Sequence, residues 1–425
     1  MFVRRSAAVL AATAVIGTAF APAALADESP GATPSQAFPS ALYGSTDPTY
    51  DGVWRQSLAL LAQDTVGVKP AKQAVDWLAG QQCESGAFAA YRPDPRAKCD
   101  AKTKVDTNST AAALQALEAL DASDAVTGAA VKWLKSVQNK DGGWGYFPGT
   151  PSDTNSTSVV IGALDAGDTD AKDVPSKDDR TPYDALLGLS VPCDGTGGGA
   201  FAFQPDKKGK LSANADATAA GVLGVLGEGL DADPDEDGAD KASPKASQCV
   251  GGHPFTVEDA AANGALYLAG AVAKNGYLKS SLPGAEDQPD YGNTADTVVA
   301  LAAAGRTADT GKPLAWLEKN SGTWAAKSGP AAYAQLIFAA NATGTDPRAF
   351  GGADLVKQLG ATGPAAASSD ASTAPADDKN DKDDKDAASD EDDGGVSLWW
   401  IIGVGLVGGI GIGFLLSGRN KKQQP

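Results

Sequence analysis

The sequence of 425 residues contains a single histidine, His253, and no excess of basic side chains. Nothing in this acidic chain, whose formal net charge is −18, suggests nucleic-acid binding, which would need a basic patch. A serine-type catalytic triad would have to use His253, and no recognisable nucleophile turn accompanies it. No two of the four cysteines have the short ligand spacing of a zinc site. We therefore expect no metal and no cofactor.

Both ends of the chain carry targeting patterns. Arg4 and Arg5, the apolar run 7–20 and Ala24-Leu25-Ala26 predict a signal peptide over residues 1–26. Residues 396–417 contain no charge, and Arg419, Lys421 and Lys422 follow directly. That length spans a bilayer, and a basic flank belongs on the cytoplasmic side. The prediction is a single-pass membrane protein whose bulk is extracellular, with a basic cytoplasmic tail over 418–425.

The segment before this hydrophobic stretch differs from the rest of the chain. Residues 361–395 contain eleven acidic residues against three lysines, which predicts a disordered acidic stalk. A cell-wall sorting signal would place Leu-Pro-x-Thr-Gly here, but the residues are Asp392-Asp393-Gly394-Gly395. We therefore interpret residues 396–417 as a retained anchor. Residues 27–50 form an N-terminal segment ahead of the main domain.

The four cysteines of an exported chain favour two disulfides, for which three pairings exist. Cys83 and Cys193 occupy similar places, each shortly before a Gly-aromatic turn. A bond between Cys83 and Cys99 would tie down one loop, and a bond between Cys193 and Cys249 would tie down another. We predict these two bonds.

An internal repeat organises residues 51–360. Trp77 and Trp133 each lie five residues before a glutamine and eleven before a second aromatic residue, Phe88 or Trp144. Asp-Thr-Asn-Ser-Thr follows in both copies, at 106–110 and 153–157. A period of about 50 residues implies stacked units that cannot bury their apolar faces alone.

The spacing of apolar residues, together with the capping, Gly and Pro residues that mark helix ends, predicts helices throughout this region. An Asp or Asn four residues before a Thr recurs at expected starts of inner helices: Asp106, Asp153, Asn214 and Asn293. Such residues cap the first turn of a helix. The twelve predicted segments are 54–63, 70–82, 107–120, 126–138, 154–166, 181–190, 212–228, 256–274, 293–304, 311–320, 330–341 and 351–359. They make an all-α fold of about six helical hairpins.

The segments Gln138-x-x-x-Gly142-x-Trp144 and Gln82-x-x-x-Gly86-x-Phe88 match the Gln-Trp repeat of squalene cyclases. Residues 51–359 thus resemble the α/α-toroid superfamily of prenyltransferase and squalene-oxidase repeat proteins. That superfamily also includes complement thioester domains and the vitamin B12 carriers of the intrinsic factor and transcobalamin type. The resemblance implies a toroid, and it leaves activity open because one toroid hosts unrelated functions.

The residues that carry chemistry in the enzymes of this superfamily are missing. The nearest matches to an Asp-x-Asp-Asp motif, at 233–237 and 381–384, lie in a Pro-broken loop and in the stalk. A prenyltransferase-like zinc site would need a Cys beside His253, and no Gly-Cys-Gly-Glu-Gln motif occurs. We therefore expect no enzymatic activity. Asp233, Asp235 and Asp237 begin like a calcium loop, but Pro244 stands at its twelfth position, so a solvated acidic loop is favoured.

Polar and aromatic residues gather before the expected inner helices, where one mouth of a toroid would bring them together. Such a mouth suits a mid-sized organic ligand, although the same residues also serve to cap helices and wedge repeats. The candidate ligand-binding residues are Trp144, Tyr146, Phe147, Asp153, Asn155, Asp106, Asn108, Tyr291, Asn293 and Asp296.

Three functions remain open. The first is a surface-anchored protein that captures a small organic ligand for uptake. The resemblance implies a corrinoid, with a separate cap protein and an uptake transporter as partners, because those carriers have a cap domain that is not found after residue 359. The second is a structural or adhesive module that binds a protein or cell-wall glycan. The third is an exported enzyme that acts on a terpenoid or lipid.

Overall fold

The computed structural model describes residues 39–232, 247–252, 254–281 and 285–367. The predicted signal peptide, transmembrane segment, cytoplasmic tail and calcium-like loop with Asp233, Asp235 and Asp237 lie outside these ranges, as does most of the stalk. None of the helices in the described part of the chain has the length and apolarity needed to cross a bilayer.

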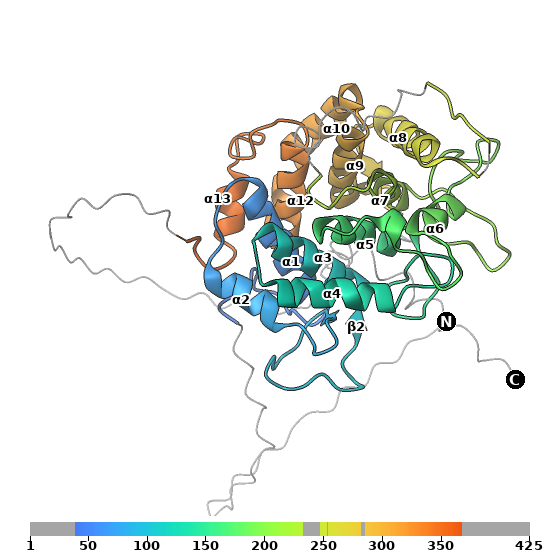
Figure 1. Ribbon diagram of the computed structural model, residues 1–425. Coiled ribbons are helices and arrows are strands. Elements are labelled where there is room, and N and C mark those ends of the chain that lie inside the picture. The colour runs from blue at the N-terminus through green and yellow to red at the C-terminus, as the bar shows by residue number, and fades with distance from the viewer. Residues whose placement is uncertain (1–38, 233–246, 253, 282–284, 368–425) are drawn as a thin grey trace, which may run out of the picture. The chain divides into compact units, whose positions relative to one another are not determined.

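Six helices form an inner ring. Each packs against the next one along the chain, and the last packs against the first, which closes the ring (Figure 1). Their bounds are α1 (Gly52–Thr65), α3 (Thr107–Ala119), α5 (Thr154–Ala166), α7 (Ala215–Leu226), α9 (Tyr291–Ala303) and α12 (Pro330–Asn341). In α3 and α5 each of the first eleven residues is buried, as expected for helices with neighbours on all sides.

Outer helices surround this ring (Figure 1). They are α2 (Lys72–Gly80), α4 (Asp124–Ser136), α6 (Pro182–Gly188), α8 (Val257–Ala273), α10 (Thr307–Asn320), α11 (Gly322–Ser328) and α13 (Leu355–Gly360). The outer helices bury one face and expose the other. In α4, Ala130, Trp133 and Leu134 are buried, whereas Lys132 and Lys135 are exposed. The predicted all-α toroid of six hairpins is confirmed for the described residues. The short helices α11 and η1 (Ala171–Asp173) were not predicted.

A threonine hydroxyl at the start of four inner helices ties each helix to the loop before it. The hydroxyls of Thr110, Thr157, Thr218 and Thr294 accept from the backbone N–H of Phe88, Trp144, Phe201 and Leu278 at 2.9–3.1 Å. Two two-residue ladders support this arrangement, β1 (Phe88–Ala89) with β2 (Val105–Asp106) and β3 (Leu278–Lys279) with β4 (Pro289–Asp290).

The prediction of Asn293 as the cap of the fourth inner helix is wrong. Asp290 caps α9, because its carboxylate accepts from the backbone N–H of Asn293 at 3.1 Å. Asp106, Asp153 and Asn214 do cap their helices as predicted. The register of the fourth copy is therefore Asp290 to Thr294, and Asn293 and Asp296 lie inside the helix.

The Gln-x-x-x-Gly-x-aromatic segments join neighbouring repeats. The side-chain nitrogen of Gln138 donates to the carbonyls of Gly142 (2.8 Å) and Val174 (3.0 Å). Gly142 has φ +93°, and a Cβ there would lie 2.1 Å from the carbonyl oxygen of Thr181. Gln82 and Gly86 repeat this geometry one unit earlier. Only glycine fits such a close approach, so the motif serves packing between repeats.

The two ends of the domain meet where the ring closes. The backbone N–H of Gly44 donates to the carbonyl of Thr362 at 2.8 Å. The hydroxyl of Tyr43, a fully buried residue, donates to the carbonyl of Pro364 at 3.2 Å. Residues before α1 and after α13 therefore lie side by side.

Both predicted disulfides are present. Cys83 is bonded to Cys99 and Cys193 to Cys249, with Cα–Cα distances of 5.7 and 5.6 Å. The first bond closes the loop between α2 and α3, and the second spans 56 residues from the loop after α6 to the segment before α8.

Candidate functional site

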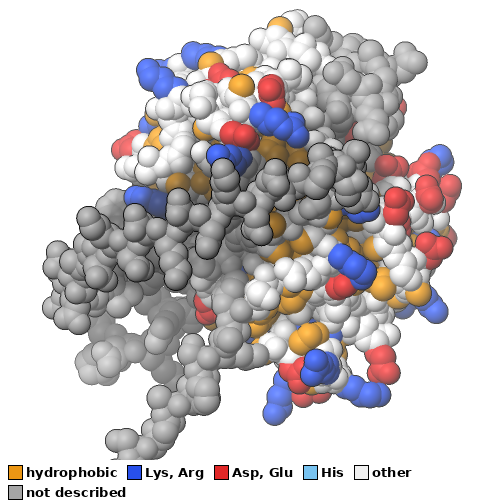
Figure 2. Space-filling view, turned by 90° about the vertical axis from the view of Figure 1, so that its left-hand side faces the viewer, with side chains coloured by type: hydrophobic (Ala, Val, Ile, Leu, Met, Phe, Trp, Pro, Cys, Tyr) orange, Lys and Arg blue, Asp and Glu red, His pale blue; other side chains and the backbone are white. Residues whose placement is uncertain are grey.

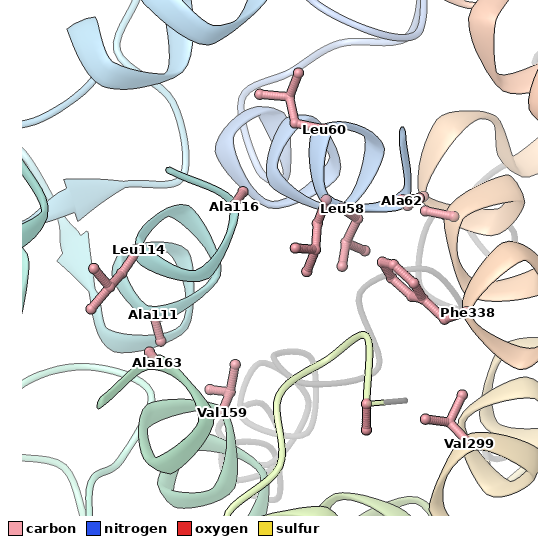
Figure 3. Close-up of a cluster of buried hydrophobic side chains, with 14 of the residues drawn as sticks. Leu58, Leu60, Ala62, Ala111, Leu114, Ala116, Val159, Ala163, Val299 and Phe338 are labelled. Atoms are coloured by element: carbon pink, nitrogen blue, oxygen red, sulfur yellow. The ribbon is translucent and has the colours of Figure 1, made fainter. Parts of the chain in front are cut away.

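A cavity of about 90 Å³ lies at the centre of the ring, and all six inner helices contribute side chains to it. Its apolar wall includes Leu58, Val159, Val299 and Phe338. Figure 3 shows these four side chains pointing from α1, α5, α9 and α12 into the space between the helices. The loop 228–230 after α7 also lines the cavity.

That loop is held by a glutamine of the ring. Gln115 of α3 accepts from the backbone N–H of Leu230 at 2.9 Å and donates to the carbonyl of Val159 at 3.0 Å. The loop follows the C-terminal end of α7, so it lies toward the end of the ring at which that helix finishes. We call the opposite end, where the inner helices begin, the start rim.

Two carboxyl–amide pairs face the cavity from neighbouring helices. Near the start rim, the side-chain nitrogen of Asn155 donates to Asp216 at 3.0 Å. One turn further in, Gln335 donates to both carboxylate oxygens of Asp296 at 3.1 Å. Each pair joins equivalent positions of two helices, two residues after the cap in the first and six residues after it in the second.

Burial raises the pKa of both carboxyl groups. It raises the pKa of Asp216 to about 7, against the hydrogen bond from Asn155, which lowers it. It raises the pKa of Asp296 to about 8, and the negative charge of Asp216 adds to this effect. Both side chains keep some accessible surface because they border the cavity, yet protein atoms surround them on the other sides. Near neutral pH, Asp296 is therefore mostly protonated.

Three polar atoms of the lining residues have no hydrogen-bond partner within the protein: Oδ1 of Asn155, Oγ of Ser158 and Oε1 of Gln335. Asn155 is 2% exposed and Ser158 is 4% exposed, so bulk solvent does not reach them freely. A buried polar atom without a partner costs about 1–3 kcal/mol. A ligand in the cavity that reached these atoms would make hydrogen bonds that the protein leaves unmade.

The structure brings three of the predicted ligand-binding residues together, since Asn155, Asn293 and Asp296 line the cavity. Asp106 and Asp153 are buried helix caps, and burial raises their pKa values to about 7 and about 6. Asn108 is buried outside the cavity lining, with both side-chain polar atoms unpartnered.

The predicted aromatic residues lie outside the cavity lining. Trp144 is 1% exposed, and its indole N–H donates to the carbonyl of Leu134 at 2.8 Å, so it packs beneath α4. Phe147 is 40% exposed and contacts Tyr146 edge to face. Tyr291 stacks with Trp324 and also packs against Trp316.

The candidate residues predicted from the sequence omit Asp216, Ser158 and Gln335, although Asp216 belongs with Asn214 and Phe201 to a polar and aromatic group equivalent to that of Asn155. A signal for Asp216 existed, because it stands two residues after its cap, as Asn155 does. Gln335 had none, since α12 begins with Gly329 and Pro330 and lacks the polar signature.

The described residues contain no group of three or more His, Cys, Asp or Glu side chains that could hold a metal ion. On the described part of the face in Figure 2, lysine and arginine side chains are interspersed with aspartate and glutamate, without a single large basic patch.

No family model and no curated protein matches the sequence. Solved structures do match. A protein from Actinoplanes shares 16% identity over 66% of this chain and 75% of its own, with a TM-score of 0.41. The type II terpene cyclase MstE from Scytonema shares 12% identity over 66% and 73%, also at 0.41. A sugar epimerase from a ruminal bacterium shares 12% over 65% and 79%, again at 0.41. At these values neither a family nor an activity follows, and nothing here adds to the likeness with corrinoid carriers.

Proposed function

We propose that this chain is a non-enzymatic toroid that captures a small polar organic ligand in the central cavity. The observation that carries this proposal is that three side chains lining a space inside the ring, those of Asn155, Ser158 and Gln335, each hold a polar atom without a partner within the protein. A purely structural toroid would gain stability by filling that space with apolar side chains.

The cavity sets the size of the ligand. Pockets for drug-sized molecules measure about 300–1,000 Å³, and this cavity measures about 90 Å³. It therefore suits a molecule of a few heavy atoms, or one polar arm of a larger molecule. A corrinoid, which the resemblance implies, would have to lie across the start rim with one amide arm inside, covered by a separate cap protein.

The proposed location is the cell surface, with residues 361–395 as a stalk and 396–417 as the anchor. The first residues of this stalk contact the domain, since Thr362 and Pro364 accept hydrogen bonds from Gly44 and Tyr43. The two disulfides support an oxidising compartment, because such bonds persist outside the cytosol. An uptake transporter would then receive the ligand.

One observation favours an enzyme as a second candidate. A carboxyl group that is protonated near neutral pH beside a second carboxyl group is an arrangement used for general acid and base catalysis. Asp296 would donate the proton and Asp216 would accept one. Recovery of the ligand unchanged after prolonged incubation with the full chain separates capture from turnover.

The test is thermal-shift screening of the full chain with small polar compounds and with cyanocobalamin, followed by calorimetry. Ala220→Leu places three further carbon atoms in the cavity lining and should abolish binding. Gly128→Ala, on the exposed side of α4, is the matched control and should leave it intact. The proposal fails if every ligand found binds the Ala220→Leu protein as well as the native one, or if no compound raises the melting temperature. Binding to isolated cell wall without any small ligand would favour the adhesive module instead.

A further inference from the structure

We propose that the central cavity selects ligands that carry an ammonium group, held by the carboxylates of Asp216 and Asp296. This inference rests on the proposed function and names the chemical class of its ligand.

The first support is that the side-chain amides lining the cavity have used their donors within the protein, while two of their acceptor atoms have no partner. The side-chain nitrogens of Asn155 and Gln335 already donate to the two carboxyl groups. Gln115 donates to a backbone carbonyl, and Asn293 donates to Asp290 at 2.8 Å. The unpartnered amide atoms, Oδ1 of Asn155 and Oε1 of Gln335, are acceptors. A ligand rich in hydrogen-bond donors fits them, and an ammonium group provides up to three donors.

The second support is charge. No lysine, arginine or histidine is among the lining residues that the structure describes. Asp290 from the start of α9 acts on both Asp216 and Asp296, and Asp153 from the start of α5 acts on Asp216. Glu228 from the loop after α7 also lines the cavity. An anionic ligand would meet no positive side chain among these lining residues, and each carboxyl group that ionises would repel it. A neutral polyol satisfies the acceptors, whereas an ammonium group also offsets the charge of buried carboxylates.

Asn155 distinguishes this site from a mere cluster of acidic residues. Asn155 is only 2% exposed, and it is one of the residues that line the cavity. Its side-chain carbonyl oxygen has no hydrogen-bond partner within the protein. Its nitrogen is fixed on Asp216, so that oxygen is held beside one of the two carboxyl groups. A cation bound there would contact both a carboxylate and an amide oxygen.

Binding should release protons. Near neutral pH the two carboxyl groups hold protons because burial raises their pKa values. An ammonium ion stabilises the carboxylate form, so each carboxyl group that ionises gives its proton to the solvent while the ligand keeps its own charge. The affinity should therefore rise with pH between 6 and 8, by up to about tenfold per pH unit for each proton released.

The experiment is calorimetric titration of the full chain with ethanolamine and with ethylene glycol, which is nearly the same size but neutral. Titrations at pH 6, 7 and 8, each in two buffers of different ionisation enthalpy, count the protons released. We expect ethanolamine to bind more tightly than ethylene glycol, with an affinity that rises with pH. Asp216→Asn and Asp296→Asn should each weaken ethanolamine binding at least about tenfold and reduce the proton release.

Asp106→Asn is the matched control. Asp106 also begins an inner helix and also has a raised pKa, but it does not line the cavity. Its variant should bind ethanolamine like the native chain, and melting curves of all three variants establish that they fold.

The outcomes separate this inference from the proposed function. If ethylene glycol or other neutral compounds bind and are lost in Ala220→Leu, while ethanolamine binds no better than its neutral partner, the cavity is a ligand site but the ammonium class is wrong. If ethanolamine binds the Asp216→Asn and Asp296→Asn proteins unchanged, the assignment of these carboxylates is wrong. If neither probe binds and no compound of the thermal-shift screen raises the melting temperature, both proposals fail.

Discussion

The side-chain nitrogen of Asn155 donates to the carboxylate of Asp216 at 3.0 Å, across a separation of 61 residues in the sequence. Both residues stand two positions after the cap of their helix. The same position of two successive repeats thus supplies both partners of a hydrogen bond between α5 and α7. The same position in α3 holds Asn108, whose side chain has no such partner.

This difference provides the first prediction. The bond from Asn155 lowers the pKa of Asp216, so Asn155→Ala should raise that pKa further above about 7. Carbon-13 NMR titration of the aspartate carboxyl groups measures the change. Asn108→Ala is the matched control, since it removes the equivalent side chain one repeat earlier. A pKa of Asp216 that stays the same in Asn155→Ala would show that the bond does not influence this carboxyl group.

The second prediction concerns stability against pH. Burial raises the pKa of four carboxyl groups from 3.8 to about 6–8: Asp106, Asp153, Asp216 and Asp296. Between about pH 4 and 8 the folded state therefore binds more protons than the unfolded state, and their contribution to stability is lost as the pH rises through the folded-state pKa values.

The native chain should thus melt at a higher temperature at pH 5 than at pH 8. Differential scanning calorimetry across this range provides the measurement. In Asp296→Asn, which cannot ionise at this position, the melting temperature should fall less steeply with pH. An equal or steeper fall in this variant would contradict the assigned direction for Asp296.

The third prediction compares two glycines. Gly142→Ala should destabilise the fold by more than about 2 kcal/mol, because the residue has φ +93° and its Cβ would collide with the carbonyl of Thr181. Gly128→Ala should stabilise it by about 0.5–1 kcal/mol, because this helical glycine has open space around it. Urea unfolding of both variants measures the difference. Similar effects in the two would mean that the loop at Gly142 can move away from α6.

The fourth prediction concerns the disulfides. Removing Cys83–Cys99 should cost about 3 kcal/mol and removing Cys193–Cys249 about 4 kcal/mol, since the second closes the longer loop. Paired Cys→Ser variants in denaturant titrations test the order. A larger loss from the first bond would indicate that native contacts, rather than freedom of the unfolded chain, determine the effect.

Much of the fold could be predicted because helix starts repeat as Asp or Asn four residues before Thr. The exception was the fourth copy, where Asp290-x-x-x-Thr294 and Asn293-x-x-x-Thr297 both fit. The two readings differ by three residues, close to one helical turn, so they bury nearly the same face. The bond from Leu278 to Thr294 and the pairing of β3 with β4 select the first. Neither is visible in a pattern along the chain.

The candidate site could be predicted only in part. Asn155, Asn293 and Asp296 belong to polar signatures, and they line the cavity. Trp144 belongs to the same signature segment, but its indole N–H donates to the carbonyl of Leu134, and its side chain lies outside the cavity lining. Gln335 contributes through the closing helix of the ring. Gln335 lines the cavity because α12 packs between α9 and α1 and closes the ring. That packing joins segments far apart in the sequence, so a local pattern does not reveal it.

The contact between α12 and α1 has a consequence for how the protein unfolds. An open array of repeats can lose its terminal unit and keep the others, because each unit contacts only its neighbours. Here every inner helix has two neighbours, so the loss of any hairpin breaks two interfaces and opens the interior to water. Unfolding should therefore be all-or-none. During synthesis, α1 must also wait for α12 before both of its neighbours in the ring are present. The ring can therefore close only once the whole domain has been synthesised.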